Sequence, residues 1–135
     1  MDGMELIAFN IISNVGMAKS LAVEALRVAR EGNYDEAEQK MAEASECLVN
    51  GHHAHASLIQ KEAAGEKVEF SLIIMHAEDQ MMAAETTKLL IEEMIEMFKQ
   101  LKGTEGNTEK KGKKKKQAHY NFCITQTRKL FSMVR

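Results

Sequence analysis

Proline and tryptophan are absent from this 135-residue sequence, and aromatic residues make up only 5% of it. Without proline, no residue interrupts a helix by lacking the backbone N–H. The scarcity of aromatic and β-branched runs leaves no segment that is typical of a strand. Alanine, methionine, leucine, isoleucine and glutamate dominate instead, and these residues favour helices. Length and composition together predict a single all-α domain.

Cysteine is nearly absent as well, because the chain has only Cys47 and Cys123. Two thiols without a CxxC motif make neither a disulfide framework nor a zinc site. No N-terminal stretch resembles a signal peptide, and we expect no run that approaches the length of a membrane span. A reducing cytoplasm is therefore the expected location.

Charge is distributed unevenly along the chain. Residues 1–101 contain 8 Lys or Arg against 18 Asp or Glu, whereas residues 102–135 contain 10 against 2. We expect residues 1–101 to form the folded domain and residues 102–135 to form a lysine-rich linker and short tail outside it. The lysine run has no interleaved aromatic residues and no recognisable motif, so no nucleic acid is expected as a partner.

Capping residues divide the first 101 residues into three helices. The first is predicted over residues 2–32, and the second over residues 33–65 with Asn33 as its N-cap. The third is predicted over residues 71–101 with Ser71 as its N-cap. Short links force neighbouring helices to run antiparallel, so we expect an up-down-up three-helix bundle.

Apolar residues at helical spacing predict the packed faces of the first two helices. Gly16 within the first helix suggests that another helix approaches closely there. The predicted packed residues are Ile7, Ile11, Val15, Ala18, Ala22, Ala25 and Ala29, followed by Ala37, Met41, Ala44, Leu48, Gly51, His55 and Leu58.

The third helix places ionisable residues on its predicted packing face. With alternating steps of three and four, that face includes His76 and Asp79. Further apolar residues broaden it, and a wide apolar surface indicates a closed homo-oligomer with this helix facing the symmetry axis. The full predicted face is Leu72, His76, Asp79, Ala83, Thr86 and Leu90, and the predicted outer residues are Glu78, Glu85, Lys88, Glu92, Glu93, Glu96 and Lys99.

His76 is the first candidate functional residue. A histidine on an apolar face is often a core residue satisfied by a local acceptor. Asp79 at i+3 and Gln80 at i+4 can both reach the imidazole from the same side of the helix, which leaves the other ring nitrogen free as a nucleophile or ligand. Both interpretations stay open on the residues alone.

Asp79 becomes a candidate metal ligand if the third helix lines a symmetry axis. Copies of this carboxylate would then meet, and they must bind a cation, share protons or remain solvated. Oxygen ligands suit Mg²⁺ or Ca²⁺, although one carboxylate per chain provides few of the ligands that these ions need.

His52, His53 and His55 form a second cluster, in which His52 and His55 share a helix face. No HExxH motif or cysteine pair supplies further zinc ligands, so helix-surface or interface histidines are favoured over a metal site. One of them could lie beside His76 across the contact between the second and third helices. The sequence also has no Gly-rich phosphate loop and no GxSxG motif.

Several stretches resemble the IIA subunits of the lactose/cellobiose (chitobiose) branch of the bacterial sugar phosphotransferase system. The segment IIMHAEDQMMA at residues 73–83 is similar to that family's active-site motif, which in one form reads HAQDHLM. The similarity covers about residues 4–101 in register. The other matching stretches are ELIAFNII at residues 5–12, GMAKSLAVEALRVA at 16–29, GNYDEA at 32–37 and LIQKEAAG at 58–65.

The resemblance implies a homotrimer of three-helix subunits, which is a nine-helix bundle. It implies that His76 receives a phosphoryl group from HPr as a tele-phosphohistidine and passes it to the cysteine of a IIB protein, which acts with the membrane IIC subunit. Asp79 would hold Mg²⁺ or another divalent cation on the trimer axis, with Gln80 and His52 in supporting positions. The chain departs from HAQDHLM at Glu78, Gln80 and Met81.

Two functions therefore remain in view. The first is a cytoplasmic phosphocarrier for uptake of a β-disaccharide such as cellobiose, chitobiose or lactose. The second is a non-catalytic helical oligomerisation or regulatory module in which His76 and Asp79 fix the register of the bundle. The hypothesis of a metal-binding bundle has less support, because the sequence has no repeated Glu-x-x-His motif.

Overall fold

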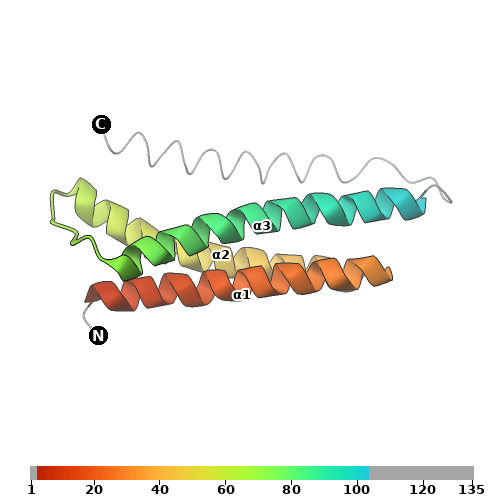
Figure 1. The fold of residues 1–135 in the computed structure, drawn as a ribbon, viewed down its shortest axis with the longest axis horizontal. Helices are drawn as coiled ribbons and strands as arrows, with labels where there is room; N and C mark the ends of the chain where they lie inside the picture. The colour runs from red at the N-terminus through yellow and green to blue at the C-terminus, as the bar shows by residue number, and fades with distance from the viewer. Residues whose placement is uncertain (1–2, 104–135) are drawn as a thin grey trace.

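The computed structural model describes residues 3–103 as three long helices. They are α1 (Gly3–Glu31), α2 (Tyr34–Ala63) and α3 (Leu72–Lys102). The helices lie side by side along the long axis of the molecule and run up, down and up (Figure 1). The predicted all-α, antiparallel three-helix fold is confirmed over the described range, and the predictions for residues 104–135 lie outside it.

The helix ends follow the predicted glycines and both predicted N-cap positions. Gly32 has a φ of 97° and Gly65 has a φ of 80°, which are conformations that glycine adopts without strain. Ser71 Oγ accepts a hydrogen bond from the Ile74 N–H at 3.4 Å, as predicted. Asn33 is the N-cap residue of α2, as predicted, and its carbonyl accepts from the Ala37 N–H at 3.1 Å, although its side chain makes no capping bond. The Asn33 N–H also closes α1 by donating to Val28 O at 3.1 Å.

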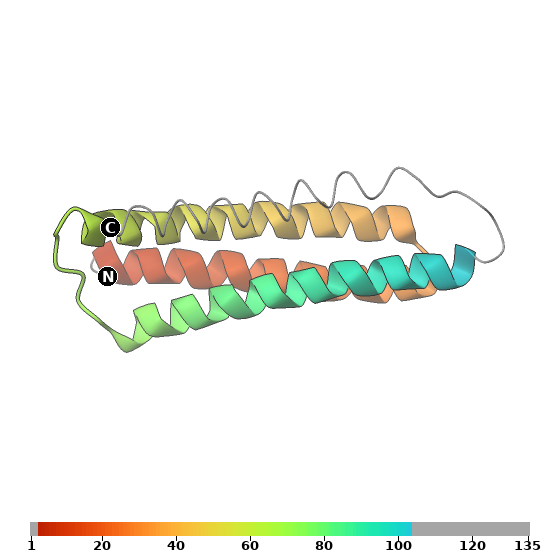
Figure 2. The ribbon, with the colours of Figure 1, turned by 90° about the horizontal axis from the view of Figure 1, so that it is seen from above.

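α1 is the central element of the packing. It contacts both α2 and α3 extensively, whereas α2 and α3 contact each other much less; in Figure 2, α1 lies between them over much of their length. The predicted faces of α1 and α2 are buried, except that Ile7 and His55 are only partly buried and Ala8 is an additional buried residue. The small residues of α1 allow this two-sided packing, and they are Ala8, Ala18, Ala22, Ala25 and Ala29.

The close helix approach occurs at Gly51, not at Gly16. A Cβ on Gly51 would lie 3.0 Å from Val15 Cγ1, so the absent side chain lets α1 and α2 approach. A Cβ on Gly16 would meet nothing within 4 Å, and the expectation of a close approach there is wrong.

The packed face of α3 differs from the predicted one. Leu72 is 78% exposed and Leu90 is 53% exposed, and His76 and Asp79 are exposed as well. α3 carries two apolar stripes, and periodicity alone does not tell which one faces α1. The stripe that packs within the chain is Ile74, Ala77, Met81, Ala84, Lys88, Ile91 and Ile95.

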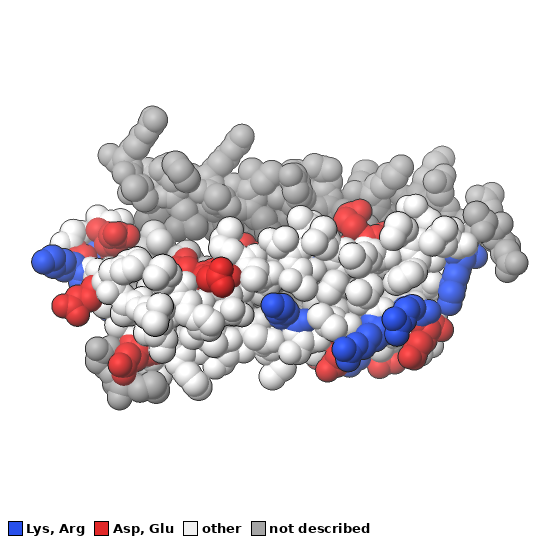
Figure 3. All heavy atoms as spheres, in the orientation of Figure 1, with Lys and Arg blue, Asp and Glu red and all other residues white. Residues whose placement is uncertain are grey.

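The second stripe, which we call the exposed α3 face, remains on the surface of the single chain. Figure 3 shows few charged side chains over the middle of this side of the molecule. The exposed α3 face comprises Leu72, Met75, Met82, Leu89, Leu90, Met94, Met97 and Leu101.

Lys88 was expected on the outside of α3, and this is wrong. It is 4% exposed, and its ammonium donates to Glu92 Oε1 at 2.5 Å. A buried ammonium needs such a partner, because burial of an unpaired charge is costly. The long aliphatic part of the side chain fills the packed stripe between Ala84 and Ile91.

The expectation that no run approaches a membrane span is also corrected for α1. One 18-residue window of this helix has a mean hydropathy of 1.5, so α1 is long and apolar enough to cross a membrane by length and composition. Its buried stripe of small and aliphatic residues, which packs against α2 and α3, gives a simpler reason for this composition.

Candidate functional site

His76 lies in the second turn of α3, on the surface of the described chain. Ser71 caps the helix, and Ile74 and Ala77 attach its first turns to the core. This attachment directs the intervening Met75 and His76 outward. The interpretation of His76 as a core histidine is therefore wrong for the single chain, and its imidazole is accessible to solvent.

Asp79 and Gln80 are the two neighbours of His76 that are predicted to support its imidazole. Asp79 is exposed and Gln80 is partly buried. Among residues 3–103, no hydrogen bond or ion pair links either side chain to His76. Their supporting roles, and that of Asp79 as a metal ligand, stay predictions.

A single chain does not assemble a metal site in the part that the structure describes. No group of three or more His, Cys, Asp or Glu side chains there could hold an ion. Asp79 contributes one carboxylate, so a cation bound by it would need ligands from further chains.

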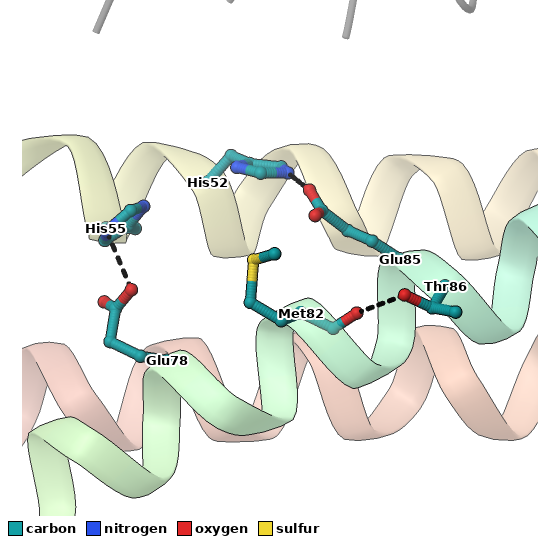
Figure 4. Close-up of polar contacts among 6 residues, drawn as sticks. All are labelled: His52, His55, Glu78, Met82, Glu85 and Thr86. Carbon is teal, nitrogen blue, oxygen red and sulfur yellow. Dashed lines mark hydrogen bonds and ion pairs between the residues drawn. The ribbon is translucent and has the colours of Figure 1, made fainter. Parts of the chain in front are cut away.

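Two histidine–glutamate pairs connect α2 to α3 (Figure 4). His55 Nε2 lies 3.0 Å from Glu78 Oε2, and His52 Nε2 forms an ion pair with Glu85 Oε1. The His55 side chain is only 15% exposed, while the His52 side chain is 45% exposed. Neither pair includes His76, so the expectation that one of these histidines lies beside His76 stays a prediction. His55 instead pairs with Glu78, two positions after His76.

Sequence reasoning missed Glu78 and Glu85 as partners of these histidines and placed them on the outside of the helix. A signal was present, because Glu78 and Glu85 are seven residues apart and so share a face of α3. His52 and His55 likewise share a face of α2, at i and i+3. Matching the two faces requires the position of α3 relative to α2, which the sequence does not provide.

The segment of α3 that carries His76, with the link before it, is acidic in sequence. Residues 68–87 contain no Lys or Arg but contain Glu69, Glu78, Asp79 and Glu85. Two of these carboxylates, those of Glu78 and Glu85, are paired with imidazoles of α2. An accessible imidazole among carboxylates and methionines can act as a nucleophile toward a docked electrophile.

Cys47, the cysteine within the described range, lies apart from this chemistry. It is a free, partly buried thiol on α2. Burial, followed by the charges of Glu46 and Glu43, raises the pKa of this thiol. A raised pKa disfavours the thiolate and argues against a nucleophilic role.

Comparisons with known proteins agree on one family. The sequence profile described as "PTS system, Lactose/Cellobiose specific IIA subunit" matches residues 6–99. The chain is 42% identical over 95 residues to the "PTS system oligo-beta-mannoside-specific EIIA component" of Bacillus subtilis, an alignment that covers 70% of this chain and 86% of that protein.

Solved structures give the same result. The cellobiose-specific enzyme IIA of Bacillus anthracis superposes with a TM-score of 0.74 at 43% identity, covering 76% of this chain and 94% of that one. The IIA(Chitobiose) protein of Escherichia coli, solved in complex with HPr, superposes with a TM-score of 0.66 at 31% identity, covering 76% and 99%.

Proposed function

Because this chain belongs to the lactose/cellobiose-specific IIA family of the phosphotransferase system, we propose that it is a cytoplasmic phosphocarrier with His76 as its phosphoryl acceptor. The donor is phospho-HPr, and the acceptor is the cysteine of a IIB protein that acts with a membrane IIC subunit. The observation that carries the proposal is the exposed imidazole of His76 within the HAED segment of α3. A complex with HPr is known for the similar IIA(Chitobiose) protein and supports this donor.

The transfer needs positioning and charge stabilisation more than additional covalent machinery. The lone pair of His76 Nε2 forms a bond to phosphorus while the bond between phosphorus and the donor breaks, and the donor retains that electron pair. The product is a tele-phosphohistidine. In the second step, the IIB thiolate attacks the same phosphorus, and the imidazole of His76 leaves with the electron pair of the broken P–N bond.

The surface around His76 suits two successive partners. Met75 is 46% exposed and Met82 is 60% exposed, and both lie on the exposed α3 face within six residues of His76. Methionine side chains repack at low cost, so one surface can contact two different proteins in turn. Docking also excludes water, which would otherwise hydrolyse the phosphoramidate.

The transported sugar is proposed as a class. The three relatives compared above are named for oligo-β-mannosides, cellobiose and chitobiose, which are all β-linked sugars. We therefore assign a β-linked di- or oligosaccharide, with cellobiose, chitobiose and lactose as the candidates. The sugar itself meets the membrane subunit and leaves no selective contact on this chain.

A homotrimer with α3 on the symmetry axis is the proposed assembly, giving nine helices. The exposed α3 face supports this assembly, because a stripe of eight large apolar side chains indicates association. On such an axis, the Asp79 carboxylates of three chains would hold Mg²⁺ or another divalent cation, whose positive charge would offset their repulsion.

Phosphorylation in vitro tests the function. The full chain is incubated with phosphoenolpyruvate, enzyme I and HPr, and its intact mass is measured before and after acid treatment. We expect one acid-labile phosphate on the wild type, none on His76→Ala, and one on the control His53→Ala, since His53 is exposed on α2. An unmodified wild type, with upstream proteins shown to be active, would contradict the proposal and favour the non-catalytic oligomerisation module.

A further inference from the structure

The His55–Glu78 pair joins α2 to the turn of α3 that carries His76. His55 Nε2 lies 3.0 Å from Glu78 Oε2, and the His55 side chain is 15% exposed. Figure 4 shows the two side chains extending toward one another from neighbouring helices. Because α2 and α3 otherwise contact each other little, this bond is one of the few direct ties between them.

A carboxylate at position 78 is unfavourable for a phosphoryl acceptor at position 76. A bound phosphoryl group adds about two negative charges at neutral pH. Glu78 and Asp79 already contribute negative charge beside it, and no Lys or Arg occurs between positions 68 and 87. Within this segment of α3, therefore, no cationic side chain offsets the added charge.

His55 has the right position and chemistry to offset the charge of Glu78. Its Nε2 lies 3.0 Å from the Glu78 carboxylate, and this pairing keeps the carboxylate on the side of α3 that faces α2. Residues two apart lie on roughly opposite sides of a helix, so this direction is also away from His76. An imidazole paired with the carboxylate in this way lowers its repulsion of a negative group at His76.

We infer that His55 is a positioning residue of the phosphoryl site, which acts by holding the Glu78 carboxylate on α2 and offsetting its charge. This inference rests on the proposed phosphocarrier function. It assigns His55 a role in the energetics of phosphoryl uptake without contact with the phosphoryl group. Alternatively, His55 could only hold α2 and α3 together, which would be a purely structural role. The positioning role and the structural role predict different phosphorylation when both His55 and Glu78 are replaced.

A double-mutant cycle separates these roles. His55→Gln, Glu78→Gln and the double variant are compared with the wild type in the equilibrium of phosphoryl exchange with HPr. We expect His55→Gln to lower the equilibrium constant for phosphorylation about two- to fivefold, the size of a charge interaction over several ångströms near a surface. Glu78→Gln should equal or exceed the wild type, and the double variant should recover the wild-type value, because the repelling charge is gone.

The second pair supplies a matched control. His52 and Glu85 have the same chemistry, but Glu85 lies nine residues beyond His76, which is about 13 Å along the helix axis and beyond the screening length of physiological salt. His52→Gln should therefore change the exchange equilibrium less than about 1.5-fold. Thermal unfolding of each variant reports the loss of the helix–helix tie separately.

Two results would overturn the inference while leaving the phosphocarrier function intact. One is an unchanged exchange equilibrium in His55→Gln, and the other is a double variant as impaired as His55→Gln, which would show a purely structural role. A wild type that takes no phosphate on His76 would overturn both the proposed function and this inference.

Discussion

The side chain at position 76 acquires its setting from its immediate neighbours. Ile74 and Ala77 are buried against the core, and this fixes the rotation of α3 so that His76 faces outward. The type of residue and its motif were apparent from the sequence. Its exposure was not, because an apolar stripe ran through the same position and suggested a packed face. The identity of the nucleophile could thus be predicted, while its surroundings required the rotation of the helix.

At the residue scale, substitutions of Gly16 and Gly51, which both lie inside helices, should have opposite effects on stability. Gly16→Ala should raise the free energy of unfolding by about 0.5–1 kcal/mol, since alanine is the better helix former and its Cβ meets nothing within 4 Å. Gly51→Ala places a Cβ 3.0 Å from Val15 Cγ1, and this overpacking should cost about 1–3 kcal/mol against the same gain in propensity.

Chemical denaturation of both variants at equal protein concentration measures the difference. Gly51→Ala should be less stable than Gly16→Ala by at least about 1 kcal/mol. Equal stability of the two variants would show that α1 moves away from α2 without cost.

At the scale of elements, α3 is attached to α2 by polar contacts at both ends. The histidine–glutamate pairs lie in its first half, and Lys99 near its C-terminus donates to Glu38 Oε1 at 2.6 Å. Lys99 also lies over the Tyr34 ring, 5.7 Å from its centroid. α3 thus packs its apolar residues against α1, and these charged and polar contacts fix its orientation relative to α2.

The Lys99 contact predicts a specific pH dependence. Burial opposes the charged form of Lys99, but the hydrogen bond and charge of Glu38 outweigh it and raise the pKa of the ammonium above its usual value. A raised pKa in the folded state means that the stabilisation is complete at neutral pH and is lost as the pH rises through that pKa. Lys99→Met should therefore lower the stability by about 0.5 kcal/mol at pH 7, which is the usual size of an ion pair that remains accessible to solvent.

Urea unfolding of the wild type and Lys99→Met at pH 7 and above pH 11 tests this prediction. The difference between the two proteins should shrink at the higher pH, where the ammonium loses its proton in both states. A difference that stays constant across this range would assign the effect to the contact with Tyr34 and to packing, and not to the charge of Glu38.

Periodicity predicts elements better than it predicts how they face one another. The bounds of all three helices, the two glycine stops and the packed faces of α1 and α2 follow from the sequence, because each helix has one dominant apolar stripe and clear end signals. α3 has two stripes, and the wrong one was assigned to the core. Which stripe packs inside the chain depends on the small residues Ala77 and Ala84, which let α3 approach α1. It also depends on Lys88, which can be buried because its ammonium donates to Glu92.

At the scale of the whole molecule, the exposed α3 face and the packed stripe should respond differently to substitution. If the exposed face joins copies of the chain, Leu90→Asn should dissociate the assembly while each chain keeps its helices, because Leu90 is 53% exposed in the single chain. Ile91 is the matched position, since it is 4% exposed and packs inside the chain. Ile91→Ala should lower the stability by about 2–5 kcal/mol through a cavity in the core.

Sedimentation equilibrium and circular dichroism, measured over a range of protein concentrations, distinguish the two effects. The wild type should sediment as three chains, and Leu90→Asn as one chain or as a concentration-dependent mixture with nearly unchanged helicity at low temperature. A wild type that sediments as a single chain at all concentrations would contradict the trimer and leave Asp79 without partner carboxylates. It would also mean that His76 accepts its phosphoryl group on an isolated three-helix bundle, with the exposed α3 face serving only the docked carrier proteins.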